Sequence, residues 1–437
     1  MGTLKIGDSV RMKYGGEATV LDEFGSGGQG TVYKVLYNGK EYALKWYHKD
    51  VFKGKEKAFY SNLENNISKG APTKDFLWPL GITEVHAGVF GYIMDMIPSG
   101  FHELTEFFVG SKKQKQVRFK SFSAVADAAI NIIQAFRELH NSGYSYQDIN
   151  NGNFFINPDN GDVLICDNDN VSPFGTNLGI LGKQRYMAPE VVTGEDPDKQ
   201  SDRFSLAVIL FRLLFINHPL EGKYSTPPCM TKELERKYYG TAPVFVYDPA
   251  DTRNRPVPGT DKNLKIFWSV YPSYIKDMFI RAFSSEVMLK QKPRVIEKEW
   301  LDVFFKLKAS IVKCPNCKEE TFLSEQGNNI CIECQHKFIV PNAIQFTLSR
   351  ILLYPGVKLM LWHVDSSQND IKTQIGEVVS NPKDKNLFGI RNQSTISWKI
   401  NLPNGTQKPL PPGAVVPVKK EFVIECTNNP NDSGKII

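Results

Sequence analysis

The stretch that decides the fold is YSYQDINNGNFFI, residues 144–156, a short polar loop between two apolar segments. Asp148 and Asn153 lie five residues apart within it. A loop aspartate is most often a turn residue that bonds its own backbone. The stretch alone therefore does not separate a structural turn from a functional site, and the residues on either side must decide.

The first hundred residues are rich in strand patterns. Residues 31–37 (TVYKVLY) and 40–47 (KEYALKWY) alternate apolar and polar side chains and are joined by Asn38-Gly39, which suits a type I′ hairpin turn. A polar, helix-compatible stretch follows at residues 53–67. Residues 76–82 (FLWPLGI) and 88–97 (GVFGYIMDMI) are expected to be two further strands.

From Phe122 to His140 the apolar residues recur with a period near 3.6, which predicts a helix that ends before Gly143. The chain then has a mostly helical pattern to about Leu307, and the apolar run at residues 206–216 is expected to be a buried helix, because it is too short to span a membrane. Strand patterns return in the last hundred residues.

Glycines at Gly25, Gly27 and Gly30 form G-x-G-x-x-G, a pattern that lets backbone N–H groups approach a phosphate. A dinucleotide-binding fingerprint must open a helix. Here the glycines run into a strand, which favours a flap over a nucleotide. Lys45 lies on the paired hairpin strand, where its ammonium could neutralise phosphates, although a surface lysine at a strand end is the simpler interpretation of that residue alone.

The glycine pattern with Val32, together with YALK at residues 42–45, resembles the glycine loop and V-A-I-K strand of protein kinases. YQDINNGN similarly resembles the kinase catalytic loop. The resemblance implies that Asp148 accepts the proton of the attacking hydroxyl and that Asn153 binds Mg²⁺. Asp167, in ICDND, occupies the place of the metal-binding aspartate, and carboxylate oxygens suit a hard cation.

The resemblance also implies a set of nucleotide-binding residues. Glu64, or its rival Glu56, is expected to pair with Lys45 from a helix. Met94 falls at the gatekeeper position before the hinge. The expected ATP-binding set is Gly25, Gly27, Gly30, Val32, Ala43, Lys45, Glu64, Asp95, Ile97 and Phe155, and the expected catalytic set is Lys45, Asp148, Asn153 and Asp167.

Further kinase features follow in order. Ala188-Pro189-Glu190 resembles the A-P-E segment, with Arg294 as the expected ion-pair partner of Glu190. Asp202 stands where the family uses an aspartate to bond the catalytic-loop backbone. These segments favour a protein substrate over a small-molecule one.

Several residues depart from the family pattern. Tyr146 and Gln147 replace the catalytic-loop histidine and arginine, so activation through a phosphate at that arginine is not expected. Asp167-Asn168-Asp169 replaces D-F-G, and Asn150 stands where serine/threonine kinases usually have a lysine. Because fold does not establish activity, three functions stay open: an active serine/threonine kinase, a pseudokinase scaffold that binds nucleotide without phosphotransfer, and phosphotransfer to a small molecule.

Four of the seven cysteines form C-x₂-C-x₁₃-C-x₂-C through Cys314, Cys317, Cys331 and Cys334. Two such pairs supply the tetrahedral set of four sulfur ligands that structural Zn²⁺ prefers. The segment resembles a zinc ribbon, and a segment this short would depend on the metal to fold.

After about residue 345, strand patterns separated by turns, such as residues 357–364 (VKLMLWHV), predict a small β-sandwich. Residues 389–418 faintly resemble the later strands of a forkhead-associated domain, without its phosphothreonine-reading residues. A β-domain for protein contacts is the alternative.

These features predict an α+β chain with a bilobal protein kinase domain at residues 1–308 (lobes at about 1–97 and 98–308), a zinc ribbon at 309–342 and a β-sandwich at 343–437. The combination is similar to bacterial kinases of tellurite-resistance-type phosphorylation triads. That resemblance implies ATP, Mg²⁺ and Zn²⁺, a protein substrate, and as partners a von Willebrand factor A-domain protein and a PP2C-like phosphatase. The net charge of +6 argues neither for nor against a nucleic-acid partner. The absence of an apolar leader favours a cytoplasmic protein, and neither a membrane nor a nucleic acid is expected as a partner.

Overall fold

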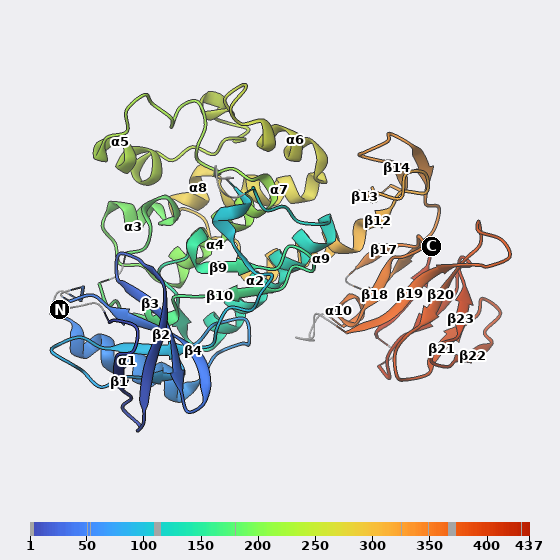
Figure 1. The fold of residues 1–437 in the computed structure, drawn as a ribbon. Coiled ribbons are helices and arrows are strands. Elements are labelled where there is room, and N and C mark those ends of the chain that lie inside the picture. Colours follow the sequence, from blue (N-terminus) through green and yellow to red (C-terminus); the bar gives the residue numbers. More distant parts are fainter. Residues whose placement is uncertain are drawn as a thin grey trace. The chain divides into compact units, whose positions relative to one another are not determined.

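The computed structural model describes residues 4–49, 51–52, 54–108, 115–179, 181–324, 326–347, 349–365, 373–429 and 431–437. Contacts divide the chain into two compact units (Figure 1). The first comprises Met1–Lys120, Ala124–Ser269 and Lys276–Asp302, and the second comprises Ser121–Ser123, Val270–Ile275 and Val303–Ile437. Among the described residues, no helix is long and apolar enough to cross a membrane.

The first unit opens with a six-stranded antiparallel sheet in the order β1-β2-β3-β4-β6-β5. Its strands are β1 (Ser9–Arg11), β2 (Glu17–Ser26), β3 (Gly30–Tyr37), β4 (Lys40–Tyr47), β5 (Gly81–Ile82) and β6 (Gly91–Met94), and α1 (Glu56–Lys69) follows β4. Asn38 and Gly39 have φ of 48° and 78°, which confirms the predicted I′ type of turn between β3 and β4.

One predicted strand is mostly wrong. Of residues 76–82, only Gly81–Ile82 form a strand. Pro79 lies in the middle of this segment, and proline has no N–H to donate to a neighbouring strand.

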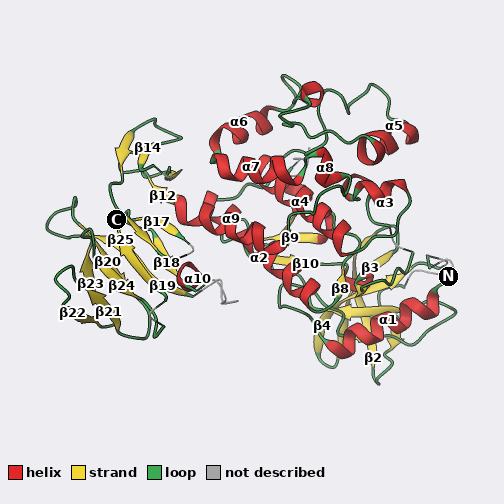
Figure 2. Ribbon diagram, turned by 180° about the vertical axis from the view of Figure 1, so that it is seen from behind, coloured by secondary structure: helices red, strands yellow, loops and turns green. Residues whose placement is uncertain are grey.

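The rest of the first unit is largely helical (Figure 2). Its helices are α2 (Phe122–Asn141), α3 (Pro189–Thr193), α4 (Lys199–Phe215), α5 (Lys232–Arg236), α6 (Lys262–Val270), α7 (Ser273–Ala282), α8 (Ser285–Met288) and α9 (Glu297–Ser310), of which α2, α6, α7 and α9 extend into residues of the second unit. The short strands among them are β7 (His102–Glu103), β8 (Tyr144–Ser145), β9 (Phe154–Ile156), β10 (Val163–Ile165) and β11 (Ser172–Pro173).

The two long apolar helices confirm their sequence patterns. Helix α2 ends at Asn141, and Gly143 follows with φ of 84°, a conformation that glycine adopts without strain. Helix α4 begins at a side-chain cap, because the Asp198 carboxylate accepts hydrogen bonds from the backbone N–H groups of Gln200 and Ser201. Nearly all its side chains after the cap are buried, as its continuous apolar run predicts.

The second unit contains two short hairpins followed by two antiparallel sheets. The hairpins pair β12 (Ile311–Lys313) with β13 (Glu320–Phe322) and β14 (Asn328–Ile330) with β15 (Lys337–Ile339). The six-stranded sheet has the order β17-β16-β25-β24-β21-β22 and the four-stranded sheet the order β18-β19-β20-β23. The strands are β16 (Ala343–Gln345), β17 (Arg350–Leu352), β18 (Lys358–Met360), β19 (Gln374–Ser380), β20 (Phe388–Asn392), β21 (Trp398–Asn401), β22 (Gln407–Leu410), β23 (Val415–Pro417), β24 (Val423–Glu425) and β25 (Ser433–Ile436).

Both sheets contribute to one core, in which Ile344, Val378, Ile390 and Ile424 are fully buried. Trp398 is 1% exposed, and its indole N–H donates to Ser394. The expected strand at residues 357–364 is wrong in its second half, where the chain forms the short helix α10 (Leu361–Val364). The His363 ring accepts the backbone N–H of Met360 there, which satisfies a donor that strand pairing would otherwise use.

Candidate active site

A cavity of about 670 Å³ in the first unit brings most of the expected catalytic residues together. It lies beneath the turn between β2 and β3, beside β4 and above the loop that follows β8. Of the sequence-predicted site residues, Gly27, Gly30, Val32, Lys45, Asp148, Asn153 and Asp167 line it. Residues separated by more than a hundred positions in the chain therefore share one concave site.

The glycines between β2 and β3 have different surroundings, so they are required for different reasons. A Cβ on Gly30 would lie 2.4 Å from the Trp46 carbonyl oxygen, so only glycine lets β3 pack against β4 here. A Cβ on Gly25 would meet nothing within 4 Å, and one on Gly27 would approach only the Gly30 carbonyl, at 3.9 Å. The turn itself is closed by a 2.8 Å hydrogen bond from Gly27 N–H to that carbonyl. Gly27 thus leaves open space at the cavity where a ligand can approach the backbone, whereas Gly25 does not line the cavity.

Lys45 is buried on β4 and held by three oxygen atoms. Its Nζ donates to Gln29 Oε1 at 3.0 Å, Asp167 Oδ1 at 3.2 Å and Asp169 Oδ2 at 2.9 Å. Burial alone would lower the pKa of Lys45, but the charges of the two aspartates outweigh burial and raise it. The lysine therefore carries a positive charge at neutral pH.

The expected pairing of Lys45 with a glutamate of α1 is wrong for both candidates, Glu64 and Glu56. Glu64 instead binds the ammonium group of Lys13. Glu56, the rival candidate, lies at the N-terminal end of α1 and accepts a hydrogen bond from Gly54 N–H. The helical phase explains the result, because the buried face of α1 consists of Phe59, Asn62, Leu63 and Asn66.

Asp148 is fixed by bonds to both its side chain and its backbone. Its Oδ1 accepts from Asn150 Nδ2 at 3.0 Å and from Lys183 N–H at 3.1 Å. The amide of Asn153 donates to the Asp148 carbonyl at 2.9 Å. Burial raises the pKa of Asp148 to about 6, so this carboxyl group is mostly ionised at neutral pH and is a stronger base than an exposed aspartate.

The two substituted residues of the catalytic loop have structural partners. Tyr146 is fully buried, and its hydroxyl donates to the carbonyl of Cys166, directly before Asp167. Gln147 is buried with φ of 70°, and its amide donates to Ser172 Oγ at 2.8 Å and to the Thr176 carbonyl at 2.7 Å. Neutral hydrogen bonds thus anchor the segment after Asp169 at the position where kinases place the arginine.

Asp167 has φ of 53°, an unusual left-handed conformation for a residue other than glycine. It precedes the 3₁₀ turn η3 (Asn168–Asn170), and its side chain is 39% exposed toward the cavity. Strain of this kind is concentrated at functional sites. Together with Asn153, it offers the cavity the oxygen ligands that Mg²⁺ prefers.

The remaining expected nucleotide-binding residues lie outside this cavity. Ala43, Ile97 and Phe155 belong to an apolar cluster that also contains Met94. The Asp95 side chain is half exposed and pairs with Lys40 at 2.8 Å, so only its backbone is available for the expected hinge role.

Two buried carboxylates of the helical part, Asp202 and Glu190, have the partners that the kinase pattern predicts. Asp202 accepts the backbone N–H groups of Tyr146 at 2.7 Å and Gln147 at 2.9 Å. Arg294 forms a bidentate pair with Glu190 at 2.7 Å for each bond. The structure therefore contains both contacts that the sequence predicts for these residues.

A model of the protein kinase domain matches residues 18–242, which is more than half of the chain. The chain belongs to the protein kinase family. The match ends within the helical part of the first unit, and Lys45, Asp148, Asn153 and Asp167 all lie inside it.

Curated relatives of this kinase match over similar lengths. Stress-activated protein kinase alpha of Dictyostelium discoideum is 28% identical over 246 residues, which are 54% of this chain and 36% of that protein. Serine/threonine-protein kinase AtPK2/AtPK19 of Arabidopsis thaliana is 26% identical over 208 residues, 46% of this chain and 42% of that protein. The chain thus spans less than half the length of these relatives. A solved kinase domain of Mycobacterium tuberculosis PknI is 19% identical, with a TM-score of 0.39, and covers 50% of this chain and 81% of that one.

The kinase site also contains residues that the sequence did not reveal. Gln29 and Asp169 bind Lys45, and the Tyr47 hydroxyl donates to Asp169 at 2.5 Å. Lys183 lines the cavity beside Asp148. The D-N-D motif was a signal for Asp169, because a carboxylate replaces the glycine expected there, whereas Gln29 and Lys183 lie in loops where spacing predicts no side-chain direction.

The Asp202 contact extends to a buried histidine. His140 bonds Asp202 at 3.1 Å and Glu297 at 2.8 Å, and Arg203 bonds Glu297 at 2.9 Å. Burial alone would lower the pKa of His140, but the hydrogen bonds to the two carboxylates outweigh burial and raise it above 6.5. For Glu297, burial is likewise outweighed, here by hydrogen bonds from His140 and Arg203, and its pKa is lowered.

These shifts predict how the stability of the kinase domain depends on pH. The contribution of His140 is complete below about pH 6.5 and is lost as the pH rises through its raised pKa. The contribution of Glu297 is present above about pH 4.5 and is lost in acid.

We expect the melting temperature to fall above pH 6.5 by up to about 3–5 °C per pH unit. Thermal denaturation from pH 5.5 to 8.5 measures this, and the fall should shrink in His140→Gln but not in His86→Gln, an exposed histidine. Equal slopes in all three proteins would contradict it.

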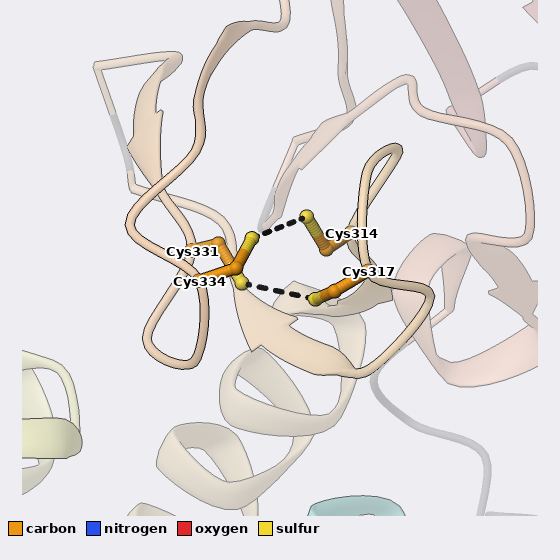
Figure 3. A group of neighbouring side chains, drawn as sticks. All are labelled: Cys314, Cys317, Cys331 and Cys334. Atoms are coloured by element: carbon orange, nitrogen blue, oxygen red, sulfur yellow. Dashed lines mark hydrogen bonds between the residues drawn. The ribbon is translucent and has the colours of Figure 1, made fainter.

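The second unit contains a separate cluster of four cysteines. The Sγ atoms of Cys314, Cys317, Cys331 and Cys334 all lie within 4.8 Å of one another and face a common centre (Figure 3). Cys314 and Cys334 are 3.8 Å apart, and Cys317 and Cys331 are 3.7 Å apart. These distances are far longer than a disulfide bond of about 2.05 Å.

Proposed function

We propose that this chain is an ATP-dependent protein kinase that transfers the γ-phosphate to Ser or Thr hydroxyls of a partner protein or of itself. The observation that supports this most is the convergence of Lys45, Asp148, Asn153 and Asp167 on one cavity beneath the glycine turn. A scaffold that only binds nucleotide does not require a proton acceptor beside two metal-binding oxygen ligands, whereas a kinase does. The serine/threonine specificity rests on the names of the relatives.

In the proposed reaction, the P–O bond between the β- and γ-phosphates breaks while the acceptor oxygen forms a new bond to the γ-phosphorus. Asp148 orients the acceptor hydroxyl and takes its proton. Asn150 and Lys183 hold its Oδ1 in place for this role. Lys45 binds the phosphates, and the open backbone at Gly27 covers them. Mg²⁺, when bound by Asn153 and Asp167, would neutralise charge on the phosphates.

The alternative is a pseudokinase that binds nucleotide and transfers nothing. One observation favours it: Lys45 is saturated by Gln29, Asp167 and Asp169, so a phosphate must displace at least one of these oxygens. In the active-kinase proposal, Gln29 moves with the glycine turn and Asp167 turns to the metal. These movements free two of the three Lys45 N–H groups to bind phosphate.

Transfer of label from [γ-³²P]ATP by the full-length chain tests the proposal. We expect label on the chain or on casein with Mg²⁺ present and none with EDTA, and acid hydrolysis should release phosphoserine or phosphothreonine. Binding of a fluorescent ATP analogue is measured alongside. Magnesium-dependent binding without any label would contradict the kinase proposal and support the scaffold.

We further propose that the four cysteines bind one structural Zn²⁺ in a ribbon. Four sulfur atoms at about 2.3 Å from a tetrahedral zinc lie about 3.8 Å from one another. Here the Sγ atoms of Cys317 and Cys331 are 3.7 Å apart, and those of Cys314 and Cys334 are 3.8 Å apart. Asn316 N–H points to Cys314 Sγ at 3.4 Å, and Asn316 Nδ2 points to Cys334 Sγ at 3.6 Å. Such N–H contacts stabilise thiolates, so the cluster fits the metal.

The domain limits at residues 308 and 342 and the role of the last module also remain proposals. We propose that the ribbon and the β-sandwich recruit the substrate or partner, for which a von Willebrand factor A-domain protein and a PP2C-like phosphatase are the candidates. Two antiparallel sheets around one core are compatible with a forkhead-associated-like module. The bacterial stress-cluster origin and the cytoplasmic location likewise stay predictions.

A further inference from the structure

Asp169 is the most buried carboxylate of the kinase site, with 0% exposure. Its Oδ2 accepts from Lys45 Nζ at 2.9 Å and from the Tyr47 hydroxyl at 2.5 Å. Its Oδ1 has no hydrogen-bond partner among the residues that the structure describes. Because a buried polar group is costly unless it is paired, the contacts with Lys45 and Tyr47 hold the Asp169 carboxyl group in this place.

Helix α1 offers Lys45 no carboxylate. Its buried face presents Phe59, Asn62, Leu63 and Asn66. Phe59 lines the cavity, and its ring lies 5.8 Å from that of Tyr47. In this structure the contacts of Lys45 therefore include no glutamate of the helix, although such a glutamate pairs with the lysine in protein kinases.

The same helix instead holds the segment that carries Asp169. Asn62 Nδ2 and Asn66 Nδ2 both donate to the Val171 carbonyl, at 2.9 and 2.8 Å. Asn168 Nδ2 donates to the carbonyls of Leu77 and Ile165, at 2.8 and 2.9 Å. Amide side chains thus fix η3 on both sides of Asp169, which makes it a rigid support for Lys45.

We propose that Asp169 is the positioning residue for Lys45 and replaces the helix glutamate of other protein kinases. The inference rests on the proposed phosphotransfer function. Asp167 also contacts Lys45, but in that function Asp167 binds the metal, so Asp169 remains as the anion dedicated to the lysine. The lysine and the metal-binding aspartate are then set by one short turn, and α1 acts on the lysine through its hydrogen bonds to the Val171 carbonyl at the end of that turn.

The test compares four variants of the full-length chain: Asp169→Asn, Lys45→Met, their combination, and Glu64→Gln. We expect Asp169→Asn to lower kcat/KM for ATP by about 10–100-fold, since misplacing a phosphate-binding group by about 1 Å can cost two orders of magnitude. In the Lys45→Met background the same substitution should have less than a twofold effect, because Asp169 acts through Lys45. Glu64→Gln should stay within twofold of the unsubstituted chain.

Three outcomes would overturn the proposal. They are an unchanged kcat/KM in Asp169→Asn, additive losses in the double variant, and a loss in Glu64→Gln as large as that in Asp169→Asn. Additive losses would assign Asp169 a purely structural role, which thermal denaturation of each variant checks independently. If Asp169→Asn does not fold, Tyr47→Phe takes its place, because it removes the hydroxyl that orients Asp169; its expected loss of about 3–10-fold should also vanish with Lys45→Met.

Failure of the proposed kinase function is distinguishable from failure of this inference. If the unsubstituted chain transfers no label but binds the fluorescent ATP analogue, the same four variants are compared by their dissociation constants. The positioning role would still be supported if Asp169→Asn weakened ATP-analogue binding in the otherwise unsubstituted chain but had no further effect in the Lys45→Met background. Equal affinities in all four would overturn it.

Discussion

Asp148→Asn is expected to lower kcat for phosphotransfer by about 10²–10⁴-fold, the usual contribution of a positioned general base. Asparagine keeps an oxygen where Asn150 Nδ2 and Lys183 N–H donate, so the loop geometry should survive. The substitution removes only the negatively charged carboxylate oxygen that would accept the proton. Single-turnover transfer from [γ-³²P]ATP measures the step directly, and the affinity for a fluorescent ATP analogue should stay within about threefold.

The matched control is Asp159→Asn, which removes an exposed carboxylate from the loop after β9. Asp159 pairs with Lys120 at the surface, at 2.6 Å, and does not line the cavity. We expect its activity to stay within twofold of the unsubstituted chain. If Asp148→Asn retained more than a tenth of the activity, Asp148 would not be the proton acceptor, and the mechanism proposed for this cavity would be wrong.

The spacing of polar residues predicted much of the site because it reflects backbone geometry. Asp148 and Asn153 face one cavity because the loop between β8 and β9 is short and closed by Asn153 Nδ2 on the Asp148 carbonyl. Lys45 is fixed by its register in β4, opposite Val32 of β3. Strand register and loop closure are local properties, and a sequence pattern can reveal them.

The partner of Lys45 could not be predicted in the same way, because it depends on the rotation of α1 about its axis. The buried face of that helix alternates apolar residues with Asn62 and Asn66, so no apolar stripe reveals its phase. Tertiary hydrogen bonds to the Val171 carbonyl set it instead. Glu64 had the family spacing but lies on the Lys13 side.

The C-terminal module shows a related limit. Its strands are mostly three to five residues long, so each carries few alternations, and residues 361–364 could be helix or strand by pattern. The sandwich was predictable as a class, because turns recur between short apolar segments. The strand order was not, because β16 pairs with β25 across nearly the whole module.

Removal of zinc is expected to unfold residues 309–342 while the kinase domain stays folded. The two hairpins of this segment have strands of only three residues each, and two-stranded hairpins of this size are marginal in water. Cys314 and Cys317 follow β12, whereas Cys331 and Cys334 lie between β14 and β15, so a metal would link one hairpin to the other. In zinc-finger peptides the metal contributes apparent free energies of about 10–16 kcal/mol, which exceeds what such hairpins can supply themselves.

Elemental analysis should therefore find one zinc per chain, falling below about 0.1 in Cys317→Ser and staying at one in Cys229→Ser, an exposed cysteine outside the cluster. Hydrogen exchange of the amides at residues 309–342 should accelerate at least a hundredfold after chelation, with no change in α4. Val312, Leu323 and Val340 join the core of the β-sheets, so part of this segment has apolar support besides the metal. If that support were sufficient, exchange would remain slow after complete zinc removal. The two hairpins would then fold without the metal, and the prediction would be wrong.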